Sequence, residues 1–137
     1  VSTFIDPELE SIELSKQYGA LGVELHTGEY SNIYEALYSN IERTHNALNY
    51  LALAQQELES KLQDSIHSLS SCAKIAQELG LSVFAGHGLN YHNVRNIVEI
   101  PHITELNIGH SIISRAVMVG LDRAIRDMQG LLFRQID

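Results

Sequence analysis

The chain has 137 residues, of which 45% are apolar and 19% charged, so it can fold around a substantial core. Its formal net charge of −8 argues against nucleic acid or an anionic membrane as a partner, although a few local donors could still bind a phosphate group. No apolar run approaches the ~18 residues of a membrane span, and a single cysteine, Cys72, excludes a disulfide framework. We therefore expect a soluble protein in which Cys72 is an ordinary buried residue.

The first predicted elements are a strand, a helix and a second strand. Val1–Ile5 is β-prone and stops at Asp6 and Pro7, where aspartate can cap a helix and proline suits its first turn. Three apolar residues of the following helix are expected to face a core: Leu9, Ile12 and Leu14. Ala20–Leu25 is predicted to be the next strand, and polar groups follow closely after it.

A long segment without glycine or proline runs from Ser31 to Leu79. Its apolar residues recur at steps of three and four, which indicates an amphipathic helix; they are Leu37, Ile41, Leu48, Leu51, Leu58, Leu62 and Leu69. One continuous helix would be ~70 Å long, so a helical hairpin or a projecting helix is favoured for this insertion, residues 31–79. Because such a stripe has to be covered, self-association through it is the preferred hypothesis.

One sequence pattern occurs twice in the last third of the chain. In Ser82–Asn90 (SVFAGHGLN) and Glu105–Ile112 (ELNIGHSI), β-prone residues lead into a Gly-His pair, after which a helical pattern begins. The predicted strands are Leu81–Ala85 and Leu106–Ile108, and the predicted helices are Asn93–Glu99, His110–Val119 and Leu121–Arg134. Loops of this kind expose unpaired amides at the positive end of a helix dipole, so an anion is the natural ligand. Glycine lets a ligand approach the backbone, and histidine exchanges protons near neutral pH.

Strict alternation of strands and helices predicts parallel strands joined by crossover helices, with ligands at the carboxyl ends of the strands. Seven residues fall at that edge: Asp6, Glu24, His26, His87, Gly88, Gly109 and His110. Four strands could form a doubly wound sheet. The glycine-rich ends of the last two strands, however, match the phosphate site after strands seven and eight of a barrel. The favoured fold is a (β/α)₈ TIM barrel of which residues 1–137 supply the C-terminal half, about four units.

Five segments resemble, in order and with similar spacing, the C-terminal half of the pyridoxine 5′-phosphate synthases of vitamin B6 biosynthesis: FIDP, VELHTGEY, AGHGLNYHNV, ELNIGHSIISRAV and GLDRAIRDM. The resemblance covers nearly all of the chain except about Ile33–Leu69. It implies a TIM barrel that condenses 3-amino-2-oxopropyl phosphate with 1-deoxy-D-xylulose 5-phosphate, giving pyridoxine 5′-phosphate, phosphate and water. It also implies a bacterial cytoplasmic octamer that uses no metal and no organic cofactor.

The same resemblance implies a role for each matching residue. His87 would be the catalytic proton donor, and Glu24 would stabilise charged intermediates; Gly88, Gly109 and His110 would bind the aminoketone phosphate. The family's N-terminal half supplies another catalytic histidine, a catalytic glutamate and the arginines that bind the pentulose phosphate. None of these is present, so we expect this chain alone not to complete the reaction, and further residues to precede Val1 in the natural protein.

Two other functions stay open at this stage. The Gly-His loops alone would suit a different phosphate-binding barrel enzyme, such as an isomerase or an aldolase, and the chain could also be a non-catalytic half-barrel that self-assembles. A metal site made of Glu24, His87 and His110 is disfavoured, because the close ligand spacing typical of zinc sites is absent. For His26 we expect a structural role, on the face of its strand opposite to Glu24 and so outside the pocket of Glu24.

Overall fold

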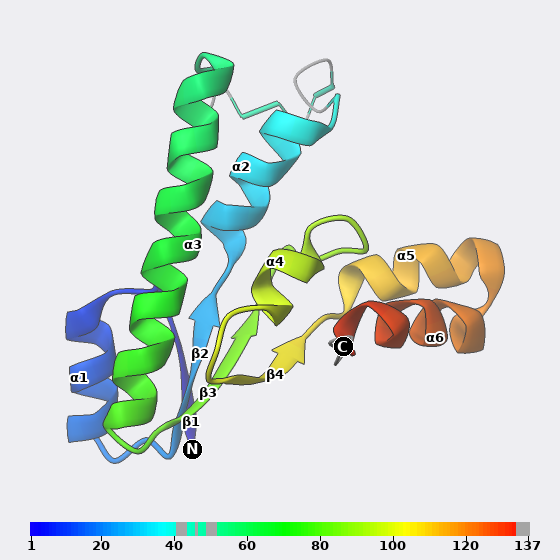
Figure 1. The fold of residues 1–137 in the computed structure, drawn as a ribbon. Coiled ribbons are helices and arrows are strands. Elements are labelled where there is room, and N and C mark those ends of the chain that lie inside the picture. The colour runs from blue at the N-terminus through cyan, green and yellow to red at the C-terminus, as the bar shows by residue number, and fades with distance from the viewer. Residues whose placement is uncertain (41–43, 46, 49–51, 134–137) are drawn as a thin grey trace.

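The computed structural model describes residues 1–40, 44–45, 47–48 and 52–133, in which strands and helices alternate along the chain (Figure 1). The strands are β1 (Ser2–Ile5), β2 (Gly22–His26), β3 (Ser82–Gly86) and β4 (Ile103–Asn107). The helices are α1 (Leu9–Gln17), α2 (Gly28–Tyr38), α3 (Gln55–Glu78), α4 (Val94–Val98), α5 (His110–Val119) and α6 (Leu121–Leu132). None of these helices is long and apolar enough to cross a membrane.

The four strands form one parallel sheet in the order β1-β2-β3-β4, so every strand lies beside its neighbour in the chain. A doubly wound sheet would reverse its order at a switch point, and these four strands contain no such reversal. The predicted α/β class with a parallel sheet is therefore confirmed.

The two faces of the sheet differ in what covers them. On one face, the side chains of Val23, Leu25 and Val83 are buried in a core to which α1, α3 and α4 contribute. On the other face, one in-register row crosses all four strands: Phe4, Glu24, Phe84 and Glu105. Phe4 and Glu105, at the two ends of this row, are exposed, and 56% of the surface of Phe4 is accessible. Among the described strands, β1 and β4 each have an outer edge without a strand partner. One face and two edges of the sheet are thus left open.

The long segment without glycine folds as two helices. Figure 1 shows α2 and α3 side by side and running in opposite directions, which is the helical hairpin favoured above. Three leucines of the apolar stripe, Leu58, Leu62 and Leu69, are at most 3% exposed, in the same core as Tyr30 and Ile33 of α2. The chain itself covers these leucines, so the hypothesis of self-association through them is wrong. Ile41 and Leu51 lie outside the described residues.

Several element boundaries and side-chain directions differ from the prediction. Helix α1 begins at Leu9, after Glu8 rather than Asp6, and of its three predicted core residues only Ile12 is buried. The reason is that Ile12 and Ser15, one turn apart, form the narrow buried edge of this short helix. Strand β4 begins at Ile103 instead of Leu106, because an exposed edge strand tolerates polar residues that otherwise indicate a loop.

Cys72 is buried as predicted, with 6% of its surface exposed. Burial raises the pKa of its thiol, so the thiolate that reacts with oxidants and metals is disfavoured. The last helix, α6, ends at Leu132 in the structure. Its predicted end, Arg134, lies outside the described residues.

Candidate functional site

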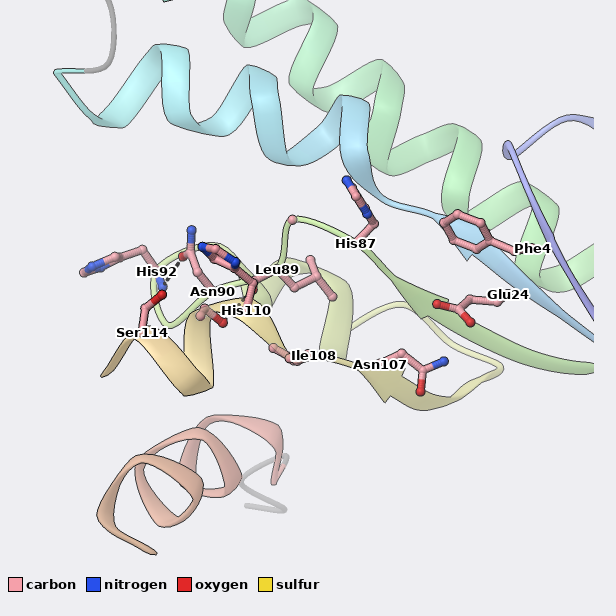
Figure 2. A pocket seen from close by; sticks show the side chains of 13 residues that line it. Phe4, Glu24, His87, Leu89, Asn90, His92, Asn107, Ile108, His110 and Ser114 are labelled. Carbon is pink, nitrogen blue, oxygen red and sulfur yellow. Dashed lines mark hydrogen bonds between the residues drawn. The ribbon is translucent and has the colours of Figure 1, made fainter. Parts of the chain in front are cut away.

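The carboxyl ends of the strands open into a cavity of about 800 Å³. Every predicted site residue lines it: Glu24, His87, Gly88, Gly109 and His110. Figure 2 shows Glu24 and Asn107 at the end of the cavity near the sheet, His110 and Ser114 at the end near α5, and His87 to one side, beside the start of α2. The structure therefore brings both Gly-His corners to one cavity, as the repeated pattern predicts.

Glu24 reaches the cavity because the neighbouring strand makes room for its side chain. Glu24 lies on β2, and the next strand contributes Gly86 beside it. A Cβ atom at Gly86 would overlap the Glu24 carboxylate and would lie 2.9 Å from the carbonyl oxygen of Asn107. Gly86 is thus required by close packing on both sides, and Glu24 is held between β1 and β3.

The first Gly-His corner has an unusual backbone that α2 holds in place. His87 and Gly88 have φ angles of 84° and 75°, in the left-handed region that is costly for a histidine. The hydroxyl of Thr27 lies within hydrogen-bond distance of two carbonyl oxygens, Gly86 O at 2.7 Å and His87 O at 2.6 Å, which share its single proton, and the hydroxyl of Ser31 donates to His87 O at 3.4 Å. These bonds from the first turn of α2 offset the strain at His87.

Two tyrosines of α2 fix the rest of the same loop. The hydroxyl of Tyr30, which is fully buried, donates to Asn93 O at 2.6 Å, and that of Tyr34 donates to His92 O at 2.9 Å. Burial raises the pKa of Tyr30, so its phenol keeps the proton that it donates. The side-chain amide of Asn93 donates in turn to Gly88 O at 3.1 Å. The loop between β3 and α4 is thereby preorganised before any ligand binds.

The second Gly-His corner presents the N-terminus of α5 to the cavity. Gly109 is the N-cap residue, and no side chain caps this helix end, so its first amides are available to a ligand. A Cβ atom added at Gly109 would have no heavy atom within 4 Å. The hydroxyl of Ser111 donates to Leu89 O at 2.8 Å and so ties the second corner to the first. Free amides, a helix dipole and the imidazole of His110 together suit an anion.

Some cavity residues were missed by the sequence prediction, namely Asn90, His92, Asn107, Ser111 and Ser114. The prediction places Asn107 inside the strand Leu106–Ile108, whereas the structure has Asn107 as the last residue of β4. Ser111 and Ser114 are one helical turn apart on α5, a spacing that places both on one face. That spacing, next to a Gly-His corner, was the signal that could have found them.

His26 lies outside the main cavity, as expected. It lines a second cavity of about 350 Å³ together with Asp6, Glu29 and His87. The expected reason for this is wrong, however. Residues two apart in a strand leave the same face, so Glu24 and His26 do not point in opposite directions from β2; they differ in that only Glu24 lines the larger cavity. His87 lines both cavities and stands at the boundary between them.

A metal site made of Glu24, His87 and His110 is disfavoured by the sequence. Within the part of the chain that the structure describes, no three histidine, cysteine, aspartate or glutamate side chains are grouped so that they could hold a metal ion. The three side chains line one cavity without forming such a group.

Fold and site together define a parallel α/β protein whose candidate anion site lies at the carboxyl ends of its last two strands. Comparison with known proteins specifies the family. The family model described as "Pyridoxal phosphate biosynthesis protein PdxJ" matches residues 1–134. This chain belongs to that family.

Curated relatives agree with this assignment. A pyridoxine 5′-phosphate synthase from Aliarcobacter butzleri is 53% identical over 132 residues, which are 96% of this chain and 51% of the relative. The synthase of the same name from Campylobacter lari is 53% identical over 134 residues, or 98% of this chain and 52% of the relative. The synthase of that name from Helicobacter hepaticus is 51% identical over 130 residues, which are 92% of this chain and 49% of the relative. The chain thus spans about half the length of these relatives.

Proposed function

We propose that this chain is the C-terminal half of a pyridoxine 5′-phosphate synthase. The reaction condenses 3-amino-2-oxopropyl phosphate with 1-deoxy-D-xylulose 5-phosphate to pyridoxine 5′-phosphate, phosphate and water, without a metal or an organic cofactor. The observation that carries this proposal is the cavity in which both Gly-His corners meet the carboxylate of Glu24. The names of the relatives agree with it.

The proposed roles are those that the family resemblance implies, and the place of each group in the cavity agrees with them. The phosphate of the aminoketone binds at Gly88, Gly109 and His110, where backbone amides at the start of α5 and an imidazole are available. Attack of the amine on a ketone, dehydration and ring closure each require protons at departing oxygens, and His87 delivers them. The carboxylate of Glu24 stabilises the cationic nitrogen intermediates across the cavity.

We also propose that residues 1–137 are half of one (β/α)₈ barrel domain, with the helical insertion at residues 31–79. The strand order without reversal supports this, since it is the order of consecutive barrel strands. The open row from Phe4 to Glu105 would then be a layer of the barrel interior, and the free edges of β1 and β4 would pair with four upstream strands. The upstream half would supply the remaining catalytic groups, so both halves are required for activity.

The assembly and location of the protein are proposed on the family resemblance. We expect a homo-oligomer, an octamer by that resemblance, in the bacterial cytoplasm. Exposed apolar side chains on and after the last two helices suit a subunit interface, among them Val117, Met118 and Phe133, which are 76–84% exposed. The partners in the reaction are the two small phosphorylated substrates, and the net charge of −8 opposes nucleic acid as a partner.

The direct test is turnover of the two phosphorylated substrates by the full-length protein that contains this chain. Formation of pyridoxine 5′-phosphate, followed by chromatography and mass, is the expected result, and the chain of residues 1–137 alone should form none. Binding of inorganic phosphate without product would instead indicate a different phosphate-binding barrel enzyme. Neither binding nor turnover would indicate a non-catalytic half-barrel.

Gly109→Ala tests the proposed phosphate site without disturbing the fold. The φ angle of Gly109 is −122°, outside the left-handed region that disfavours a side chain, and the added methyl group meets open space. If the phosphate lies against this backbone, the methyl group blocks it, and the KM for the aminoketone phosphate should rise about tenfold or more, equivalent to ~1.4 kcal/mol. Steady-state kinetics with each substrate varied in turn measures this.

The matched control is Gly130→Ala on α6, where an added methyl group also has nothing within 4 Å. It should leave both KM values unchanged. An unchanged KM in Gly109→Ala itself would contradict a phosphate at this corner.

A further inference from the structure

Three aromatic rings form a row across the carboxyl ends of three neighbouring strands. The ring of His26 lies edge-on between Phe4 and His87, with centroid distances of 5.0 Å to Phe4 and 4.8 Å to His87 and interplanar angles of 73° and 60°. These residues come from β1, from the last position of β2 and from the residue after β3. The row ends at the histidine to which the proposed function assigns proton transfer.

The middle ring of this row is held from two further sides. Nδ1 of His26 lies 3.0 Å from Oδ1 of Asp6, at hydrogen-bond distance. A Cβ atom at Gly28 would come within 2.7 Å of Nε2 of His26 and 3.3 Å of Cδ2 of His87, so the start of α2 fits closely against both rings. His26 therefore has little freedom to rotate, although its side chain is 31% exposed.

The ring of His87 has no comparable restraint of its own. Thr27 and Ser31 bind the backbone carbonyl of His87, not its side chain. Among the described residues, no hydrogen bond is recorded for its imidazole nitrogens, and the residue is exposed. An exposed side chain in this state samples several rotamers, whereas a proton donor needs one orientation toward its substrate. The packed ring of His26, together with the start of α2, limits this rotation.

We propose that His26, fixed by Asp6, is a positioning residue that holds the ring of His87 in its orientation for proton transfer. This inference rests on the proposed function. His26 does not line the larger cavity where the substrates would bind, so it acts through His87 and not on the substrate. Phe4 supports the ring of His26 from the other side. The role of His26 is thus structural, as expected, but it affects catalysis because it sets the orientation of His87.

The test uses the full-length protein and two substitutions of Asp6. Asp6→Ala removes the acceptor and frees the ring of His26; it should lower kcat about tenfold while both KM values stay within about twofold, because misplaced catalytic groups slow the chemical step. Asp6→Asn keeps an oxygen that accepts from Nδ1–H, and should restore most of kcat. A merely structural role for this pair would change stability without this split between kcat and KM. His26→Ala should lower kcat at least as much as Asp6→Ala.

A matched control and a readout independent of turnover complete the test. Glu29→Gln removes a carboxylate from the same small cavity outside the row of rings, and should leave kcat unchanged. The Cδ2–H resonance of His87, in protein labelled at histidine, should shift or broaden in Asp6→Ala and stay at its wild-type position in Asp6→Asn and Glu29→Gln.

The two proposals fail in different ways. Wild-type protein that makes no pyridoxine 5′-phosphate would overturn the proposed function, and the resonance of His87 would still decide whether His26 positions it. Wild-type kcat and an unchanged resonance in Asp6→Ala would overturn the positioning role, as would equal impairment of Asp6→Asn and Asp6→Ala.

Discussion

Replacing His87 by asparagine in the full-length protein is expected to lower kcat by about 10²- to 10⁴-fold, the range that general acid–base catalysis contributes. Asparagine cannot deliver a proton at neutral pH, so the effect should fall on kcat more than on KM. The fold should survive, since asparagine is one of the few residues that tolerate the φ of 84° found here. Steady-state kinetics with both phosphorylated substrates, together with a thermal melt, measures the two effects.

The chain offers a closely matched control in His102. Among the described residues other than glycine, only His87 and His102 have a positive φ, and that of His102 is 74°. His102 lies outside the larger cavity. His102→Asn therefore makes the same chemical change on a similar backbone, and should leave kcat at its wild-type value. If His87→Asn kept more than about a tenth of wild-type kcat, His87 would not be the proton donor.

Gly86→Ala is expected to destabilise the protein by about 1–3 kcal/mol, the usual cost of overpacking. The new methyl group would overlap the Glu24 carboxylate and sit 2.9 Å from Asn107 O, a backbone atom of β4 that cannot move without disturbing the sheet. Urea denaturation of the full-length protein measures the loss. Activity should fall as well, because Glu24 has to leave its place in the cavity.

For comparison, Gly130→Ala on α6 should change stability in the opposite direction, by about 0.5–1 kcal/mol, since alanine is the better helix former and an added methyl group has no atom within 4 Å. Wild-type stability in Gly86→Ala would mean that β2 and β4 are not packed against this glycine. The carboxylate of Glu24 would then lie elsewhere than the structure places it.

The parts of the fold that could be predicted are those with a strong local signal. The alternation of apolar runs with helical patterns is sufficient to predict a parallel sheet, and the predicted helix His110–Val119 has the bounds observed for α5. Both Gly-His corners were recognisable because each joins a strand to a helix over a few residues. Since parallel strands end at one edge, the meeting of the corners in one cavity followed from topology alone.

The parts that could not be predicted depend on residues far apart in the sequence. The bond from Thr27 to the carbonyl of Gly86 joins positions 59 apart, and the contact between Asp6 and His26 spans 20. Asp6 followed by Pro7 has the local pattern of a helix cap. No periodicity in the sequence indicates that the carboxylate of Asp6 contacts His26 instead. The leucine stripe was similarly ambiguous, because a pattern shows that a face is apolar without showing that α2 covers it.

The open edges of β1 and β4 have a consequence for how such a protein is made. In the proposed barrel, the upstream strands leave the ribosome first, and they cannot close into a ring until this half has been synthesised. In that barrel the last pairing would join the free edge of β4 to the first strand of the whole protein, which would make it the most distant contact in the sequence and a slow step of folding. Until then, unpaired backbone groups at each edge can capture other nascent chains, so synthesis of this family should depend on chaperones that shield strand edges.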